Sequence, residues 1–222
     1  MEKVNPNFKI GDLVVVKSYP KELIDGKPLT GDPLHLPPIM CVIEVEIEDK
    51  NKKTHDNVTG KQIAERVKYK LIWFNNKKSE FVEKIMYESC LILYESKREN
   101  LPTYNYGDVI EFITTSLEIS KEKQSITKTK RENLSIDEGD SERTKESEKT
   151  DVTSLMTYAC PNLVMTGIKR NEIVEEFNDK GVLKRKVPSL LIKVMWFNYQ
   201  HQKYSEYELP IECLTLESNN KK

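Results

Sequence analysis

The chain has 222 residues, of which 32% are charged and 37% hydrophobic, and its net charge is −1. This balance leaves no bulk field that would draw the chain onto nucleic acid or an anionic membrane. No apolar stretch is long enough to span a bilayer, and residues 1–9 lack the apolar core of a signal peptide. We therefore expect a cytoplasmic protein of one or two domains without membrane partners.

An internal repeat organises the chain. Trp-Phe-Asn at 73–75 recurs at 196–198, an offset of 123, and these hold both tryptophans of the chain. The same offset aligns residues 38–93 with residues 161–216 without a gap. A repeat of this kind predicts two copies of one structural unit.

The start of each copy aligns at a smaller offset of 96, which matches Gly-Asp at 11–12 with Gly-Asp at 107–108. The second copy therefore holds extra residues between its first two strands. Residues 118–151 carry eight basic and ten acidic side chains and no aromatic one. Such a segment buries too little apolar surface to offset its ordering entropy, which predicts a disordered insertion. It is either a solvated spacer or a segment that folds on contact with a partner.

The sequence of each copy predicts five short strands. In the first copy they are expected at 13–16, 41–48, 67–74 and 80–85, followed by a one-turn helix and a last short strand within 86–91. Such a unit predicts an all-β fold, namely two tandem SH3-like β-barrels. The expected divisions are a tail (1–7), barrel 1 (8–95), a linker (96–103), barrel 2 (104–217, with the 118–151 insertion) and a tail (218–222).

Alternation along the strands predicts which side chains face the core. Ile43, Val45 and Ile47 should point inward, and the glutamates at 44, 46 and 48 should face water. Val14 and Val16 should point inward and residue 15 outward. The two tryptophans are expected in the two cores.

Several short motifs together resemble the YodC-like family of small, uncharacterised bacterial proteins. They are Gly11-Asp12, Pro38-Ile39-Met40, Trp73-Phe74 and the segment Met86 to Leu91, with their second-copy counterparts. The resemblance implies a bacterial protein with one SH3-like barrel per copy, and it implies no activity. The chain departs from the family where a tight Gly-Gly turn would precede the proline, since residues 18–36 and 116–160 stand there.

No group of residues predicts an enzyme, a metal site or a cofactor. The histidines at 35, 55 and 201 have no counterpart in the other copy, and acid–base catalysis needs converging groups. The four cysteines form no Cys-x-x-Cys pair. Cys90 and Cys213 share one repeat position, which predicts small buried apolar residues rather than nucleophiles.

An apolar pair on the outer side of each copy predicts an interaction surface. Ile72 and Phe74 point away from the side of Trp73, and Met195 and Phe197 repeat the arrangement. Such a pair needs a cover, which is the other barrel, an end of its own core or a protein partner. The predicted partner-binding residues are Ile72, Phe74, Lys77, Lys78, Met195 and Phe197.

The alternative function is nucleic-acid association through basic loops of the first copy, with Lys50, Lys52 and Lys53 as the binding residues. Charge balance opposes it, because residues 8–96 carry fourteen basic and fourteen acidic side chains. The sequence therefore favours a non-catalytic adaptor or accessory subunit that docks another protein, and leaves its oligomeric state open.

Overall fold

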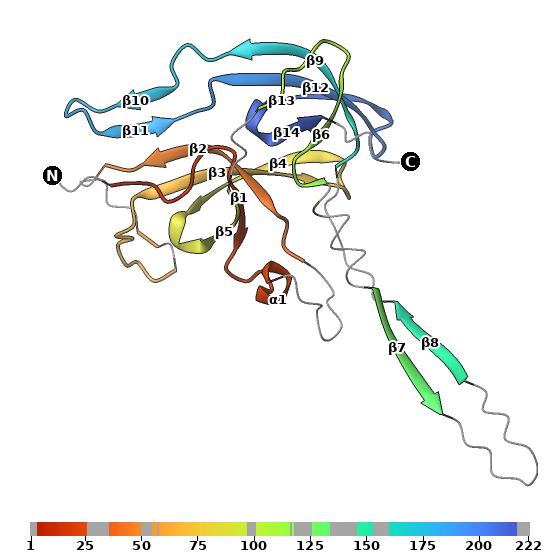
Figure 1. Cartoon of the computed structure of the whole chain (residues 1–222). Helices are drawn as coiled ribbons and strands as arrows, with labels where there is room; N and C mark the ends of the chain where they lie inside the picture. The colour runs from red at the N-terminus through yellow and green to blue at the C-terminus, as the bar shows by residue number, and fades with distance from the viewer. Residues whose placement is uncertain are drawn as a thin grey trace, which may run out of the picture.

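The computed structural model describes residues 4–25, 36–49, 55–56, 58–96, 101–115, 117, 126–133, 146–152 and 160–216. These residues form two antiparallel sheets and a separate two-stranded hairpin (Figure 1). A four-residue helix, α1 (Lys21–Ile24), follows the first strand. The all-β class predicted from the sequence is confirmed.

Both copies have the same strand order. The first runs β4-β3-β2-β1-β5 and the second β13-β12-β9-β6-β14. The first-copy elements are β1 (Leu13–Val16), β2 (Met40–Ile47), β3 (Val67–Asn75), β4 (Glu80–Tyr87), the 3-10 turn η1 (Glu88–Cys90) and β5 (Leu91–Glu95). The second-copy elements are β6 (Val109–Phe112), β9 (Leu163–Arg170), β12 (Leu190–Asn198), β13 (Lys203–Pro210), the 3-10 turn η2 (Ile211–Cys213) and β14 (Leu214–Leu216). Within the described residues, no strand pairing closes either sheet into a barrel.

The Gly-Asp motif forms the same turn in each copy. Gly11 and Gly107 have φ angles of 92° and 88°, which favour glycine because side chains with a Cβ rarely adopt them. The Asp12 and Asp108 carboxylates each accept the backbone N–H three residues earlier, at 2.7 Å. The motif is therefore structural: it directs the chain into β1 and β6.

A hairpin in the second copy extends the sheet of the first. Strands β10 (Glu175–Phe177) and β11 (Leu183–Lys186) pair with each other, and Arg185 and Lys186 in β11 pair with Glu46 and Val45 in β2. No strands were predicted in this segment from the sequence. The missed signal is Asn-Asp-Lys-Gly at 178–181, a turn in which Asn178 Oδ1 accepts two backbone N–H groups and Gly181 has a φ of 69°.

The predicted disordered insertion, 118–151, contains two described strands. β7 (Ile126–Asn133) and β8 (Glu146–Val152) pair antiparallel. Their register places Lys128 opposite Asp151 and Arg131 opposite Glu148. The rest of the segment lies outside the described residues.

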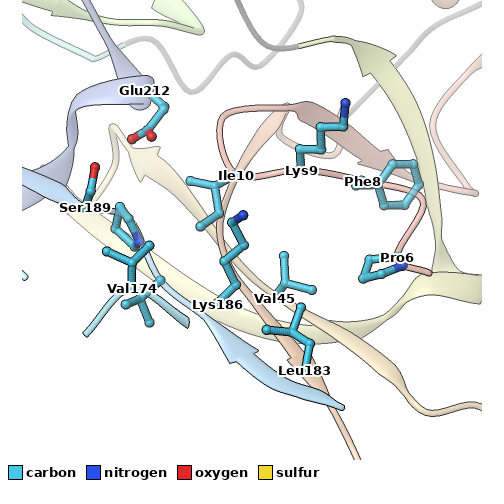
Figure 2. A pocket seen from close by; sticks show the side chains of 12 residues that line it. Pro6, Phe8, Lys9, Ile10, Val45, Val174, Leu183, Lys186, Ser189 and Glu212 are labelled. Carbon is cyan, nitrogen blue, oxygen red and sulfur yellow. The ribbon is translucent and has the colours of Figure 1, made fainter. Parts of the chain in front are cut away.

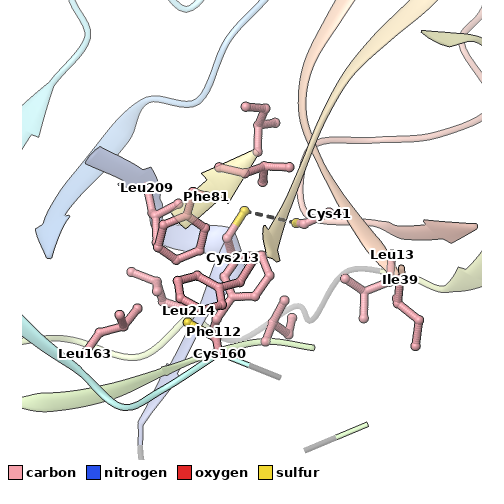
Figure 3. Packing of buried hydrophobic residues seen from close by; sticks show 14 of the residues in the cluster. Leu13, Ile39, Cys41, Phe81, Phe112, Cys160, Leu163, Leu209, Cys213 and Leu214 are labelled. Carbon is pink, nitrogen blue, oxygen red and sulfur yellow. Dashed lines mark hydrogen bonds between the residues drawn. The ribbon is translucent and has the colours of Figure 1, made fainter. Parts of the chain in front are cut away.

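Two clusters of buried side chains form the core. The first-copy core comprises Phe8, Ile10, Val14, Met40, Val42, Val45, Val67, Tyr69, Leu71 and Leu91. The shared core, part of which is drawn in Figure 3, draws on both copies and includes Leu13, Val15, Cys41, Ile72, Phe74 and Phe81 with Phe112, Leu163, Val194, Trp196, Leu209 and Cys213. The second copy therefore closes its core against the outer side of the first.

Three predictions about side-chain orientation need correction. Val15 was expected to face outward but is fully buried in the shared core. Glu48 was expected in water but is buried, where it pairs with Lys68 and accepts a hydrogen bond from Tyr87 Oη at 3.3 Å. Trp196 is buried as predicted, whereas Trp73 is only half-buried at the margin of the first-copy core.

Candidate functional site

The two copies present the same face in different surroundings. One cross-strand row of the first copy is Leu13, Cys41, Ile72 and Glu83, and the next pair is Phe74 and Phe81. The matching row of the second copy is Val109, Val164, Met195 and Glu206, and the next pair is Phe197 and Tyr204. We call these sets the first outer face and the second outer face.

The first outer face is buried against the second copy. Phe74 and Phe81 are 2% and 8% exposed, and their rings meet at 5.0 Å with an interplanar angle of 74°. The Phe81 ring centroid lies 5.3 Å from those of Trp196 and Phe112 and 5.4 Å from that of Tyr207. This aromatic cluster joins the two copies, and the contacts of Phe81 with Phe74, Trp196 and Phe112 have the edge-to-face geometry that rings prefer.

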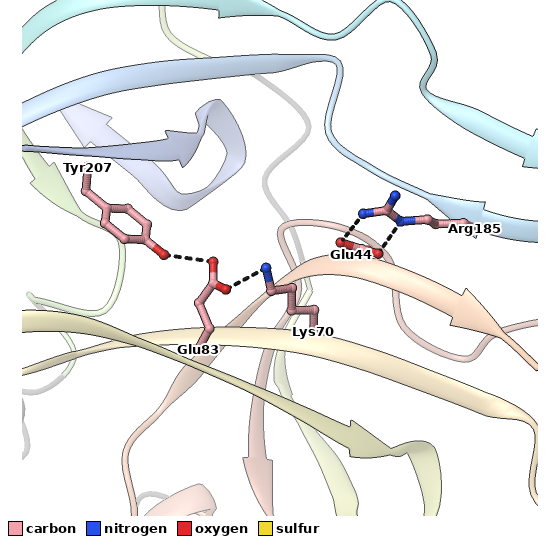
Figure 4. Close-up of polar contacts among 5 residues, drawn as sticks. All are labelled: Glu44, Lys70, Glu83, Arg185 and Tyr207. Carbon is pink, nitrogen blue, oxygen red and sulfur yellow. Dashed lines mark hydrogen bonds and ion pairs between the residues drawn. The ribbon is translucent and has the colours of Figure 1, made fainter. Parts of the chain in front are cut away.

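Hydrogen bonds fix the edge of this contact. The Ser79 carbonyl, in a turn with a φ of 52°, accepts Trp196 Nε1 at 3.0 Å and Asn198 Nδ2 at 2.9 Å. Tyr207 Oη donates to Glu83 at 2.8 Å, and Lys70 pairs with the other oxygen of Glu83 at 2.5 Å (Figure 4). Burial and the bond to Glu83 raise the pKa of Tyr207 above its ordinary value.

The cysteines also differ between the two copies. Cys41 and Cys213 are both fully buried, and their Sγ atoms lie 3.0 Å apart between the copies (Figure 3). Burial raises the pKa of the Cys213 thiol well above its ordinary value. Cys90, the repeat counterpart of Cys213, is exposed, so the prediction that both are buried is wrong for Cys90. Cys213 is buried where it meets Cys41 of the first copy.

The second outer face is open. Phe197 and Tyr204 are 38% and 69% exposed, and their rings meet at 5.5 Å and 76°, nearly the geometry of Phe74 and Phe81. Tyr199, which is also exposed, packs its ring 5.1 Å from that of Phe197. Val109 adds exposed apolar surface at the other end of the row. Exposed apolar surface of this kind makes the second outer face a candidate interaction site.

The predicted partner-binding residues are thus divided. Ile72 and Phe74 are buried under the second copy and are closed to an external partner, since the other copy is their cover. Phe197 is exposed, Met195 half-buried, and Lys77 and Lys78 lie exposed in the β3–β4 turn. The predicted nucleic-acid-binding residues, Lys50, Lys52 and Lys53, lie outside the described residues.

Sequence reasoning missed Tyr199 and Tyr204. The repeat alignment could have found Tyr204, because the offset of 123 places it on Phe81. Tyr199 aligns with Asn76 and has no such signal. Only the folded hairpin brings its ring onto Phe197.

A cavity of about 450 Å³ lies between the two copies. Figure 2 shows it between the chain at Phe8 and Ile10, β2 at Val45, and the second-copy residues Leu183 and Glu212. Glu212 Oε2 is buried, and no described group donates a hydrogen bond to it. The Lys186 ammonium at the wall is already paired with Glu175 at 2.6 Å.

The described residues hold no group of three His, Cys, Asp or Glu side chains placed to bind a metal ion. His55 and His201 are exposed on separate loops, and His35 lies outside the described residues. Over the same residues, no helix has the length and apolar character to cross a membrane.

The fold and these surfaces define an all-β protein of two repeated sheets, one of which has an aromatic face that the described residues leave exposed. Comparison with protein-family models, with curated proteins and with solved structures gives no match.

Proposed function

We propose that this protein is a non-catalytic adaptor that docks a protein partner on its second outer face. The observation that carries the proposal is that the first outer face is buried against the second copy. The same rows of the same sheet, with the same pair of rings, are a docking surface for protein within this chain. The second outer face keeps that character without a described cover.

The charges around the second outer face favour protein over nucleic acid. Lys193 pairs with Glu206 and Lys169 with Glu208, each at 2.8 Å, so these lysines are already neutralised by neighbouring carboxylates. Phosphate binding draws its affinity from basic side chains that release counterions. The paired lysines supply little of that effect, so the alternative function, nucleic-acid association, depends on Lys50, Lys52 and Lys53.

The proposal includes the finer fold assignment. The strand order β4-β3-β2-β1-β5, with the 3-10 turn η1 before the last strand, supports an SH3-like unit of the YodC-like kind in each copy. A cytoplasmic location belongs to the same proposal. It suits the four free cysteines, because thiols stay reduced in that compartment.

The test is a matched pair of charge substitutions. Tyr204→Glu places a carboxylate in the second outer face, and Val58→Glu places one on a side chain that is 93% exposed elsewhere. Proteins retained by the immobilised wild type are purified and titrated against each variant by calorimetry. We expect Tyr204→Glu to weaken binding at least about tenfold and Val58→Glu to leave it unchanged. Retention of every purified partner by Tyr204→Glu contradicts the proposal, and steeply salt-dependent binding to single-stranded RNA or DNA favours the alternative.

A further inference from the structure

We propose that the protein associates with itself head to tail. The second outer face of one molecule docks on the first copy of the next molecule, in the way that the two copies dock within the chain. This inference rests on the proposed function, because it names a second copy of the chain as the occupant of that face.

Among the described residues, five side chains of the second copy contact the first outer face or the adjoining Ser79 carbonyl. They are Phe112, Trp196, Asn198, Tyr207 and Cys213. Their repeat counterparts in the first copy are Val16, Trp73, Asn75, Lys84 and Cys90. We call the latter set the first receiving surface.

The first receiving surface is accessible. Val16, Trp73 and Asn75 are half-buried, and Lys84 and Cys90 are exposed. Its second-copy counterpart is mostly buried, because the first outer face lies on it. Each molecule therefore carries both an open second outer face and an open first receiving surface.

Superposing the internal contact on two molecules matches chemically compatible groups. Tyr204 takes the place of Phe81 and meets Trp73 and Val16, as Phe81 meets Trp196 and Phe112. Val164 takes the place of Cys41 and meets Cys90. An apolar group meets an apolar or aromatic group at each of these positions.

The polar edge is also reproduced. Gln202 takes the place of Ser79, and the two residues have nearly the same left-handed φ, 49° and 52°. Within the chain the Ser79 carbonyl accepts hydrogen bonds from Trp196 and Asn198. In the next molecule, Trp73 and Asn75 carry the same donor groups for the Gln202 carbonyl.

One residue that differs between the two copies adds an ion pair to the proposed contact between molecules. Glu83 pairs with Lys70 and accepts the hydroxyl of Tyr207, and its counterpart Glu206 pairs with Lys193 in the same way. The residue that takes the place of Tyr207 is Lys84. The hydrogen bond within the chain thus becomes a Glu206–Lys84 ion pair between chains, and such complementary charges fix register and orientation.

This contact joins two different surfaces, so it does not close on itself in a dimer. Such heterologous association gives rings where the rotation closes and open chains where it does not. The internal contact is favoured by the short linker at 96–103, which gives it a high effective concentration. Contacts between molecules therefore form at higher protein concentration.

The experiment measures mass against concentration for the full chain, by light scattering and sedimentation from about 1 µM to about 1 mM. We expect the wild-type mass to rise with concentration and Val58→Glu to behave like the wild type. Tyr204→Glu disables the second outer face and Lys84→Glu the first receiving surface, so each variant alone stays monomeric. An unchanged melting temperature verifies that these exposed substitutions leave the fold intact.

Mixing the two disabled variants tests whether the association is head to tail. A Tyr204→Glu molecule keeps its receiving surface and a Lys84→Glu molecule keeps its face, so an equimolar mixture forms a species that stops at two chains. A wild type that is monomeric over the whole range overturns the inference, as does association of Lys84→Glu alone, which indicates a face-to-face contact. If the wild type is monomeric but Tyr204→Glu loses a purified partner, self-association is wrong and the proposed function stands. If Tyr204→Glu alters neither property, both are wrong.

Discussion

Phe81 and Tyr204 occupy the same position of the same strand in the two copies. Phe81 is nevertheless buried between the copies, whereas Tyr204 is exposed to solvent. Their ring partners, Phe74 and Phe197, lie at nearly the same distance and angle. The local structure of the face is therefore the same in both copies. What differs is whether another sheet lies opposite, so strand pattern alone does not decide which apolar face is core.

Truncation of the Phe81 and Tyr204 rings should give the largest difference between the two faces. Phe81→Ala removes a buried ring that touches four other aromatic side chains, so it should lower the free energy of unfolding by about 3–5 kcal/mol. Tyr204→Ala removes an exposed ring and should change it by less than about 0.5 kcal/mol. Urea denaturation followed by tryptophan fluorescence measures both. Equal losses would show that the two faces are alike in solution.

The cysteine counterparts should separate in the same direction. Cys213→Ser places a hydroxyl in the shared core against Cys41 and should cost about 1–3 kcal/mol, because a buried hydroxyl without an acceptor loses its hydration. Cys90→Ser should cost almost nothing, because Cys90 is exposed. A thiol reagent should likewise modify Cys90 before the buried Cys160 and Cys213, whose pKa values are raised by burial. Faster labelling of Cys213 than of Cys90 contradicts the buried contact.

Tyr207 links stability to alkaline pH. Its pKa lies above the ordinary value of 10.0, so folding favours the neutral phenol. The contribution is complete below about pH 10 and is lost as pH rises towards the higher folded-state pKa. Tyr207→Phe should cost about 1 kcal/mol at neutral pH and should destabilise less steeply than the wild type above about pH 10.

The control for Tyr207 is Tyr204→Phe, which removes an exposed hydroxyl and should alter neither quantity. Thermal melts over the alkaline range measure both variants. An alkaline slope identical in the wild type and Tyr207→Phe would exclude this tyrosine as the titrating group.

The smallest effect is expected at the β10–β11 hairpin. The Arg185 guanidinium bonds both Glu44 carboxylate oxygens, the second at 3.1 Å, and the first of these bonds raises the pKa of Arg185 (Figure 4). Because the pair is partly exposed, Arg185→Ala should cost only about 0.2–1 kcal/mol. Hydrogen exchange of the β11 amides should nevertheless accelerate. Lys169→Ala, which breaks the exposed pair with Glu208 within the second copy, should leave that exchange unchanged.

Local patterns were enough to predict several parts of the fold. The repeat located the matching strands, the Gly-Asp pairs located both turns, and the one-turn helices appear as η1 and η2 before the last strands. These features depend on backbone preferences and on alternation over a few residues, which the sequence carries directly. The placement of Phe74 and Phe197 on the outer side of their copies was predicted from the same alternation.

The alternating pattern assigned side chains to two faces of each strand, but it could not say which face meets another sheet. Ile72 and Phe74 became core because the second copy lies on the first outer face, whereas their counterparts Met195 and Phe197 are half-buried and exposed. The docking of β11 on β2 likewise joins residues far apart in the chain. Period-two alternation is the same for a covered and an uncovered face, so the sequence by itself determined the repeated sheet, and only the packing of one copy on the other decided which face is buried.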